Sequence, residues 1–312
     1  MTSPTSLSTS AILNRLQEIR TSRIRVPTEV SQLGQQLAHT NWLTRDTDQA
    51  WIVKEQIAFS AIESGQLSLA SALIDALSKK YPDSPRIIAL KGALLEGQGE
   101  LRQAREWYES RLKEKETDIV IRKRLITLHL SIPIPSPLNP TSTSIESSGL
   151  SREKGISLLT TYLDTSYIDA EAWLLLSRSY SELGLFDQAS ISLNHAVLLQ
   201  PQNPFILLQH AELEFTRGEF ETGLKEFLRV IEMSSELEKG KGGGLMGCGR
   251  RAALGARMCI SRLRGKGKSQ MGQDVLDKLE LVLIEQVLKG YRGKREGEGE
   301  ELRVMREWLA NR

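Results

Sequence analysis

The sequence predicts an all-α fold in which helical hairpins of constant length stack side by side into a solenoid. Two observations lead to this prediction. Apolar side chains recur with helical spacing through most of the 312 residues. Glycines that would separate two helices lie 34 residues apart, at Gly65 and Gly99 and again at Gly184 and Gly218. A fixed stride is typical of repeated hairpins, each of which leaves an apolar face that the next one covers.

The N-terminal region is predicted to contain two capping helices. Residues 1–10 are rich in Ser and Thr, and we expect them to be disordered. They lack the basic region followed by an apolar stretch that marks a secretory signal. Within residues 11–50, apolar side chains follow helical spacing over 11–23 and 30–42, so two helices are expected to cover the first hairpin.

Residues 51–237 are predicted to form an array of five hairpins, the clearest of which begins at Ala170. Its predicted core combines large and small side chains, a turn glycine and a helix-ending proline, namely Trp173, Tyr180, Gly184, Ala189 and Pro201. This pattern resembles the tetratricopeptide repeat. The first hairpin departs from it, because Lys54 stands where the family has a large apolar residue.

The third hairpin of the array is predicted to carry an insertion. Gly99 and Gly184 are 85 residues apart, which is 17 more than two repeats require. Residues 132–149 contain four prolines and seven Ser or Thr residues, a composition that cannot continue a helix or bury a face. We therefore expect a surface loop there.

The C-terminal part is divided by glycines and charge. Residues 238–249 contain six glycines and are predicted to form a loop. Residues 250–290 resume the helical pattern, and residues 291–312 form a charged tail with Trp308 as a large apolar residue. No stretch approaches the ~20 apolar residues that cross a bilayer.

Positive charge is concentrated towards the C-terminus. The chain has 41 Lys and Arg against 39 Asp and Glu, but from Lys239 onwards the numbers are 17 and 9. Nine cations and no acid lie between Glu238 and Asp274. The predicted basic surface consists of Arg250, Arg251, Arg257, Arg262 and Arg264. Three interpretations stay open: a solvated helix face, a contact with an acidic partner or anionic membrane, and nucleic-acid binding, which the absence of aromatic residues disfavours.

No catalytic, metal or cofactor site is predicted. The four histidines show no ligand spacing, and Cys248 and Cys259 have no nearby His or acid. Gly267-Lys268-Ser269 resembles the end of a phosphate loop, but Arg262 stands where that motif needs glycine. The sequence therefore predicts a non-enzymatic protein with no cofactor and no small-molecule substrate.

The first helices of the hairpins are expected to line a concave groove that binds a partner. The predicted groove residues are Phe59, Glu171, Leu174, Arg178, Phe205, Leu208, Glu212 and Phe215. This mixture of apolar and charged side chains suits a helix or extended segment of another protein. The alternative is that some of these residues pack beneath neighbouring helices.

A second resemblance rests on specific stretches. The YPDS of 81–84, the IRKR of 121–124 and the YLDT and DAEAW of 162–173 are similar to the family of the second subunit of the endoplasmic reticulum (ER) membrane protein complex. The resemblance covers about residues 30–265. It departs from the family in the insertion 132–149 and in the glycine-rich residues 239–249.

This resemblance implies a non-catalytic cytosolic scaffold, peripheral on the cytoplasmic face of the ER membrane. Its partners would be cytosolic segments of the membrane-spanning subunits, in a complex that inserts tail-anchored and multispanning proteins. Nucleic acid would not be a partner. The alternative is a free cytosolic tetratricopeptide-repeat adaptor or co-chaperone that binds short peptides, and a third possibility, an RNA-associated repeat protein, rests on the basic run alone.

Overall fold

The computed structural model describes residues 8–133, 149–237, 247–266 and 272–291, together with residues 303, 304 and 307. Within these ranges the chain forms 14 α-helices and no strand, so the predicted all-α class is confirmed. The predicted insertion, glycine-rich loop and charged tail lie largely outside the described residues. The chain divides into two compact units, Met1–Leu158 and Leu159–Arg312, which are described separately.

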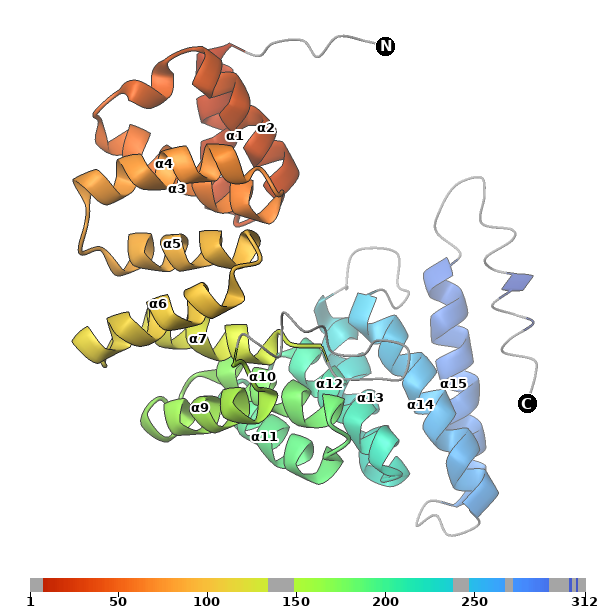
Figure 1. Ribbon diagram of the computed structural model, residues 1–312. Coiled ribbons are helices and arrows are strands. Elements are labelled where there is room, and N and C mark those ends of the chain that lie inside the picture. The colour runs from red at the N-terminus through yellow and green to blue at the C-terminus, as the bar shows by residue number, and fades with distance from the viewer. Residues whose placement is uncertain are drawn as a thin grey trace. The chain divides into compact units, whose positions relative to one another are not determined.

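The first unit consists of two N-terminal helices followed by helical hairpins (Figure 1). Its helices are α1 (Thr9–Ser22), α2 (Pro27–His39), α3 (Asp48–Glu63), α4 (Leu67–Lys80), α5 (Pro85–Gly97), α6 (Leu101–Glu114) and α7 (Ile119–Leu130). A further helix, α9 (Arg152–Thr165), crosses the boundary between the units.

Side-chain caps set helix starts that the apolar pattern placed too late. The Ser8 hydroxyl accepts a hydrogen bond from the Ala11 amide at 3.3 Å, so α1 begins at Thr9, inside the stretch predicted to be disordered. The Thr47 hydroxyl accepts from the Ala50 amide at 3.3 Å, and α3 accordingly begins at Asp48, before the predicted start of the array at residue 51.

The periodic glycines close the hairpins, as their spacing predicts. Gly65 and Gly99 in the first unit have φ of 75° and 82°, and Gly184 and Gly218 in the second have 74° and 86°. This left-handed conformation lets the amide of the next residue reach back to the helix, as from Glu100 to the Leu95 carbonyl at 3.0 Å. A side chain with a Cβ would strain each of these turns.

Tyr108 on α6 is the largest fully buried side chain of the first unit, at 0% exposure. Its ring lies directly over Gly92 on α5, where a Cβ would come within 2.1 Å of the ring. The close approach of these two helices therefore depends on a glycine at position 92.

Replacing Gly92 by alanine is expected to lower the free energy of unfolding by about 1–3 kcal/mol, because the added methyl collides with the Tyr108 ring. Thermal unfolding followed by circular dichroism measures the loss. The matched control is Gly265→Ala on α14, where no atom lies within 4 Å of the new Cβ. There the higher helix propensity of alanine should leave stability unchanged or slightly raised. Equal effects of the two substitutions would contradict the packing.

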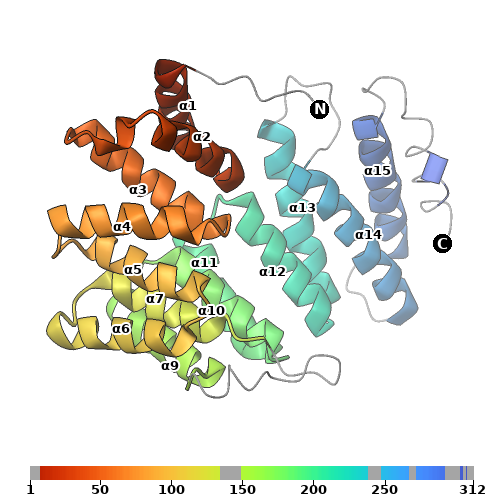
Figure 2. The ribbon, with the colours of Figure 1, turned by 45° about the horizontal axis from the view of Figure 1, so that its top comes forward.

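The second unit continues the pattern of adjacent antiparallel helices. Its helices are α10 (Ala170–Glu182), α11 (Phe186–Leu199), α12 (Pro204–Arg217), α13 (Phe220–Leu237), α14 (Gly247–Lys266) and α15 (Gln273–Tyr291). Figures 1 and 2 show α12, α13, α14 and α15 side by side in chain order, and each contacts the next.

The predicted loop 238–249 is wrong at its C-terminal end, because α14 already begins at Gly247. Packing against α13 explains the early start. The Cys248 thiol lies 3.4 Å from the Ser234 hydroxyl of α13, and Ala252, one turn later, is fully buried. Burial of this small-residue face stabilises a helical turn that glycines alone would disfavour.

Candidate partner-binding surfaces

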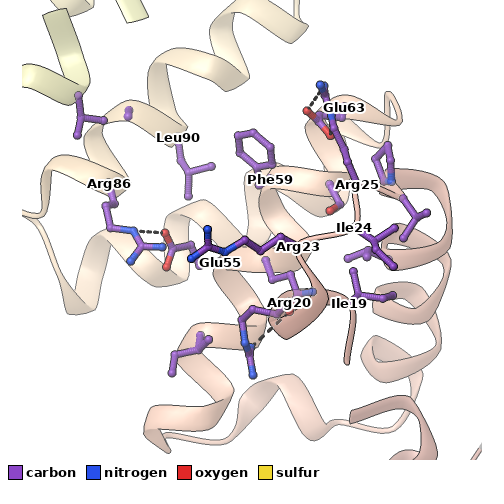
Figure 3. A pocket seen from close by; sticks show the side chains of 18 of the residues that line it. Ile19, Arg20, Arg23, Ile24, Arg25, Glu55, Phe59, Glu63, Arg86 and Leu90 are labelled. Atoms are coloured by element: carbon purple, nitrogen blue, oxygen red, sulfur yellow. Dashed lines mark hydrogen bonds and ion pairs between the residues drawn. The ribbon is translucent and has the colours of Figure 1, made fainter. Parts of the chain in front are cut away.

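A pocket of about 500 Å³ lies in the first unit, among α1, α2, α3, α5 and the start of α7 (Figure 3). Apolar side chains that remain partly exposed line it, namely Ile24, Ile52, Phe59 and Val120 at 57%, 47%, 40% and 43% exposure. Three of these four come from the first helices of two hairpins, Ile52 and Phe59 from α3 and Val120 from α7, which is where a groove was predicted. Phe59 is therefore placed on an accessible concave surface.

The connection between α1 and α2 contributes to this pocket, which the sequence did not indicate. Arg23 ends α1 with a left-handed φ of 54°, and Ile24 and Arg25 follow in the pocket wall. The connection carries no periodic pattern, since it lies between helices. Only its position against α3, where Arg25 pairs with Glu63, makes these residues part of the site.

Charged side chains surround the apolar surface of the pocket. The Arg25 guanidinium lies 2.6 Å from Glu63, and that of Arg86 lies 2.7 Å from Glu55. The guanidinium carbon of Arg124 lies over the Phe59 ring, 5.7 Å from its centroid. The pocket therefore presents an apolar centre with cationic groups held beside it.

The predicted groove residues of the second unit lie on two helices, α10 and α12. Phe205 is 64% exposed and Glu171 is also exposed, so both are accessible. Leu208 is only 5% exposed and packs in the core with α14 residues, so it offers no surface to a partner. Phe215 is partly buried and lies 5.3 Å from the Phe220 ring.

The remaining predicted groove residues of the second unit make contacts with other residues of the same chain. Leu174 is half-buried and packs against a core cluster formed by α11 and α12, and the Arg178 guanidinium lies 3.0 Å from the Glu182 carboxylate. Glu212 accepts two hydrogen bonds from Arg251, at 2.5 and 2.8 Å. Fewer of the predicted groove residues of the second unit are therefore available to a partner than the sequence predicted.

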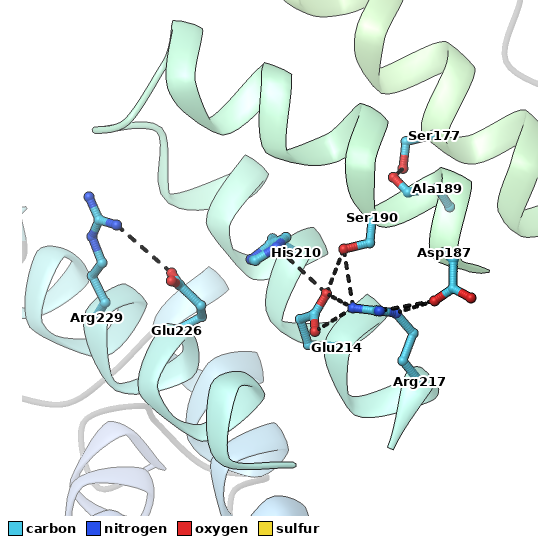
Figure 4. Close-up of polar contacts among 9 residues, drawn as sticks. All are labelled: Ser177, Asp187, Ala189, Ser190, His210, Glu214, Arg217, Glu226 and Arg229. Carbon is cyan, nitrogen blue, oxygen red and sulfur yellow. Dashed lines mark hydrogen bonds and ion pairs between the residues drawn. The ribbon is translucent and has the colours of Figure 1, made fainter. Parts of the chain in front are cut away.

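A buried polar network joins α11 and α12 close to this groove (Figure 4). Glu214 is 4% exposed and accepts a hydrogen bond from the Ser190 hydroxyl at 2.7 Å. The Arg217 guanidinium donates to both oxygens of Glu214 at 2.9 Å and reaches Asp187 on α11 at 2.9 Å. His210 Nε2 lies 3.7 Å from Glu214. The network neutralises a buried carboxylate and holds two hairpins together.

The predicted basic surface is largely used inside the second unit. Arg257 is 8% exposed, and its guanidinium lies 3.2 Å from Glu280 on α15. Arg264 pairs with the same carboxylate at 2.5 Å and also with Asp277. The prediction of an open basic surface is therefore wrong for Arg257, because α15 brings acids to the cationic face of α14.

The other members of the basic run differ in exposure. Arg251 pairs with Glu212, as described above, and Arg250 is half-buried with contacts of its own. Arg262 is exposed. Of the five arginines of the predicted basic surface, Arg251 and Arg262 are therefore exposed, whereas Arg257 is buried.

The predicted core of the clearest hairpin is only partly a core. Ala189 is fully buried, and its carbonyl accepts a hydrogen bond from the Ser177 hydroxyl at 2.8 Å. Trp173 is half-buried and stacks on the His195 ring at 4.3 Å, while Tyr180 is also half-buried. Pro201 is exposed in the turn after α11. Trp173 and Tyr180 therefore lie at the edge of the core rather than inside it.

The described residues contain no group of three or more His, Cys, Asp or Glu that could hold a metal ion. In the same part of the chain, no helix has the length and apolar character to span a bilayer. Of the histidines, His129 is fully buried and accepts a hydrogen bond from the Ser151 amide at 3.2 Å, and burial lowers its pKa.

The two cysteines are expected to react very differently. Cys259 is 0% exposed, and burial raises the pKa of its thiol to about 12, whereas Cys248 is partly exposed. In the native protein at about pH 8, a thiol reagent should modify Cys248 first and Cys259 only after unfolding. A reagent that releases a coloured product on reaction shows, by absorbance, one thiol modified in the native protein and the second only after denaturant is added.

The same shift has a defined sign for stability. The pKa of Cys259 in the folded protein, about 12, exceeds the unfolded value of 9.0. Above pH 9 the thiol ionises in the unfolded chain but not in the folded one, so the free energy of unfolding is highest below pH 9 and falls as pH rises towards 12. Rapid modification of both thiols in the folded protein would contradict the burial of Cys259.

Comparisons with known proteins agree with the repeat architecture. A family profile named "Tetratricopeptide repeat" matches residues 170–203. The TPR repeat protein oca3 of Schizosaccharomyces pombe is 29% identical over 212 residues, which is 66% of this chain and 69% of that protein. An ER membrane protein complex subunit 2 of Xenopus tropicalis is 25% identical over 225 residues, 71% of this chain and 70% of that protein.

Among solved structures, a TPR protein of Thermus thermophilus is similar with a TM-score of 0.43 and 17% identity, over 66% of this chain and 98% of that one. The matched repeat coincides with α10 and α11. The chain contains a tetratricopeptide repeat at residues 170–203 and is homologous to proteins named subunit 2 of the ER membrane protein complex.

Proposed function

We propose that this protein is a non-catalytic scaffold subunit of the ER membrane protein complex. It would lie at the cytoplasmic face of the ER membrane and bind cytosolic segments of the membrane-spanning subunits. In that position it would support insertion of tail-anchored and multispanning proteins. It would need no cofactor, nucleic acid or small-molecule substrate.

The observation that carries the proposal is the relationship with ER membrane protein complex subunit 2, which extends over about 70% of both chains. The repeat architecture supports it, because stacked helical hairpins offer extended surfaces for other chains. Exposed apolar residues on both units, such as Phe59 and Phe205, would be covered in an assembly.

Membrane fractionation and purification test this function. The full chain, tagged and expressed in its own cells, should sediment with ER membranes and be released by alkaline carbonate as a peripheral protein. In detergent it should co-purify with membrane-spanning proteins and stay bound at about 0.5 M salt, because buried apolar contacts resist screening. Recovery of the chain entirely in the soluble fraction, without membrane proteins, would overturn the proposal.

A free adaptor that binds short peptides is the second candidate. The pocket of about 500 Å³ favours it, since a cavity of this size accommodates a few side chains of one segment. An adaptor should exchange its partners rapidly and lose them in the salt wash described above.

A further inference from the structure

We propose that the pocket of the first unit binds a partner segment in which carboxylate side chains flank a large apolar side chain. The inference rests on the proposed function, because it specifies the kind of segment that the scaffold receives. It concerns the pocket formed by α1, α2, α3, α5 and α7 and requires nothing of the second unit.

The centre of the pocket is suited to an apolar side chain. Ile52 and Phe59 lie on the same face of α3, about two turns apart, and Ile24 and Val120 approach from the α1–α2 connection and from α7. All four retain 40–57% of their surface exposed although they line a concave site. Covering them with one Leu, Ile or Phe side chain removes apolar surface of both partners from water.

The rim of the pocket carries an excess of positive charge. The lining residues include five arginines and two glutamates. Both glutamates are engaged, Glu63 with Arg25 and Glu55 with Arg86. The other three guanidiniums, of Arg20, Arg23 and Arg124, form no ion pair with a described residue; Arg20 donates to the Gln56 side chain at 3.4 Å.

This excess is local to the pocket. Residues 1–158 contain 20 Lys and Arg and 17 Asp and Glu, so the first unit has a net charge of +3. The pocket lining alone has the same net charge, and the rest of the unit is therefore balanced. A partner with carboxylates would find complementary charge at the pocket.

The arginines lie close enough to the apolar centre of the pocket for one partner segment to contact both. Arg124 lies over the Phe59 ring, so a carboxylate paired with it stands beside the apolar centre. Arg23 extends from the end of α1 across the pocket towards the α3 side, as Figure 3 shows. Guanidiniums pair with carboxylates through two parallel hydrogen bonds, which favours Asp or Glu at fixed positions next to the apolar residue.

An inorganic anion would interact with the arginines of this pocket but not with its apolar side chains. Phosphate would neutralise the guanidiniums but leave the four apolar side chains in water. An amphipathic acidic segment satisfies both, and we therefore favour a protein partner over a lipid headgroup.

Selection from a library tests the inference without assuming a sequence. The full chain is immobilised and challenged with a phage-displayed library of random dodecapeptides, and the selected peptides are synthesised with a fluorescein label for anisotropy. We expect enrichment of Asp and Glu beside Leu, Ile or Phe. Arg23→Glu combined with Arg124→Glu should weaken the selected peptide by about tenfold or more, and added salt should weaken it further.

Matched variants separate the pocket from general charge. Arg102→Glu alters an exposed arginine on α6 outside the pocket lining and should leave the affinity within about twofold. Phe59→Ser should weaken binding at low and high salt alike, because it removes apolar contact. Circular dichroism of each variant checks that the helices remain intact.

Defined outcomes overturn the inference. Selected peptides that lack acids, or binding that survives the double reversal at Arg23 and Arg124, would contradict it. So would binding of phosphatidylserine vesicles that depends on these two arginines and that the selected peptide does not displace.

The result is independent of the test of function. A chain that co-purifies with membrane proteins but selects no acidic peptide retains the proposed function and loses this site. A chain that selects acidic peptides through Arg23 and Arg124 but is absent from ER membranes retains the site and loses the function.

Discussion

Replacement of Tyr108 by alanine is expected to lower the free energy of unfolding by about 3–5 kcal/mol, because it removes a large, fully buried side chain. The side chain is 0% exposed, and its ring fills the space over Gly92 between α5 and α6. Its hydroxyl donates to Glu96 at 2.5 Å. Burial, and to a lesser extent the nearby Glu96 carboxylate, raises the pKa of the phenol. The hydroxyl therefore stays protonated and continues to donate its hydrogen bond to Glu96.

Chemical denaturation followed by circular dichroism measures this effect. Tyr108→Phe keeps the ring and removes only the hydrogen bond, so about 1 kcal/mol should be lost. Tyr167→Ala removes the same type of side chain at 67% exposure and should change stability little. A Tyr108→Ala variant as stable as Tyr167→Ala would contradict the packing of α6 on α5.

Replacement of Arg217 by alanine is expected to destabilise the second unit by on the order of 3 kcal/mol, because Glu214 then remains buried with an uncompensated charge. Glu214 is 4% exposed and receives both of its short charged hydrogen bonds from Arg217. The guanidinium itself is 27% exposed, so the effect stays at the lower end for a buried pair.

A second substitution distinguishes this mechanism from loss of packing. Glu214→Gln in the Arg217→Ala background removes the buried charge and should recover a large part of the lost stability. As a control, Arg178→Ala breaks a solvent-exposed pair with Glu182 and should cost under about 0.5 kcal/mol. Equal destabilisation by Arg217→Ala and Arg178→Ala would show that the buried network contributes nothing.

The hairpin pattern was predictable because it depends on local rules. Gly65, Gly99, Gly184 and Gly218 have the positive φ that their spacing requires, and the helices lie between them. Helix starts were less accurate, since the caps Ser8 and Thr47 precede the first apolar residue of their helices.

The sequence showed where residues depart from the repeat pattern, but it did not show which contacts allow those residues to fit the fold. Lys54 replaces a large apolar residue and is nevertheless only 4% exposed. Its ammonium lies 3.6 Å from the centroid of the Trp51 ring and donates to the Arg45 carbonyl at 3.2 Å, while burial lowers its pKa. The contact with Arg45, which lies before α3, depends on how the chain enters the array.

The site was predicted in part, for a related reason. Phe59 was placed in a groove because repeat register assigns it to the concave face, and the pocket lies there. Leu208 was assigned to the same concave face, at a different position of its repeat, but it is buried in a core with α14 residues, which the register does not describe. Arg23 and Ile24 escaped notice because the α1–α2 connection has no periodicity.

The sequence by itself determined that this chain is helical, that its hairpins repeat and where their turns lie, because glycine conformation and apolar spacing act within one or two helices. Only the tertiary structure decided which charges remain available. Arg257 and Arg264 belong to a run without acids in the sequence, yet Glu280 from the next helix neutralises them, whereas Arg23 and Arg124 gather around a pocket from opposite ends of the first unit. Electrostatic pairing depends on distance in space, and sequence spacing carries no information about it between helices.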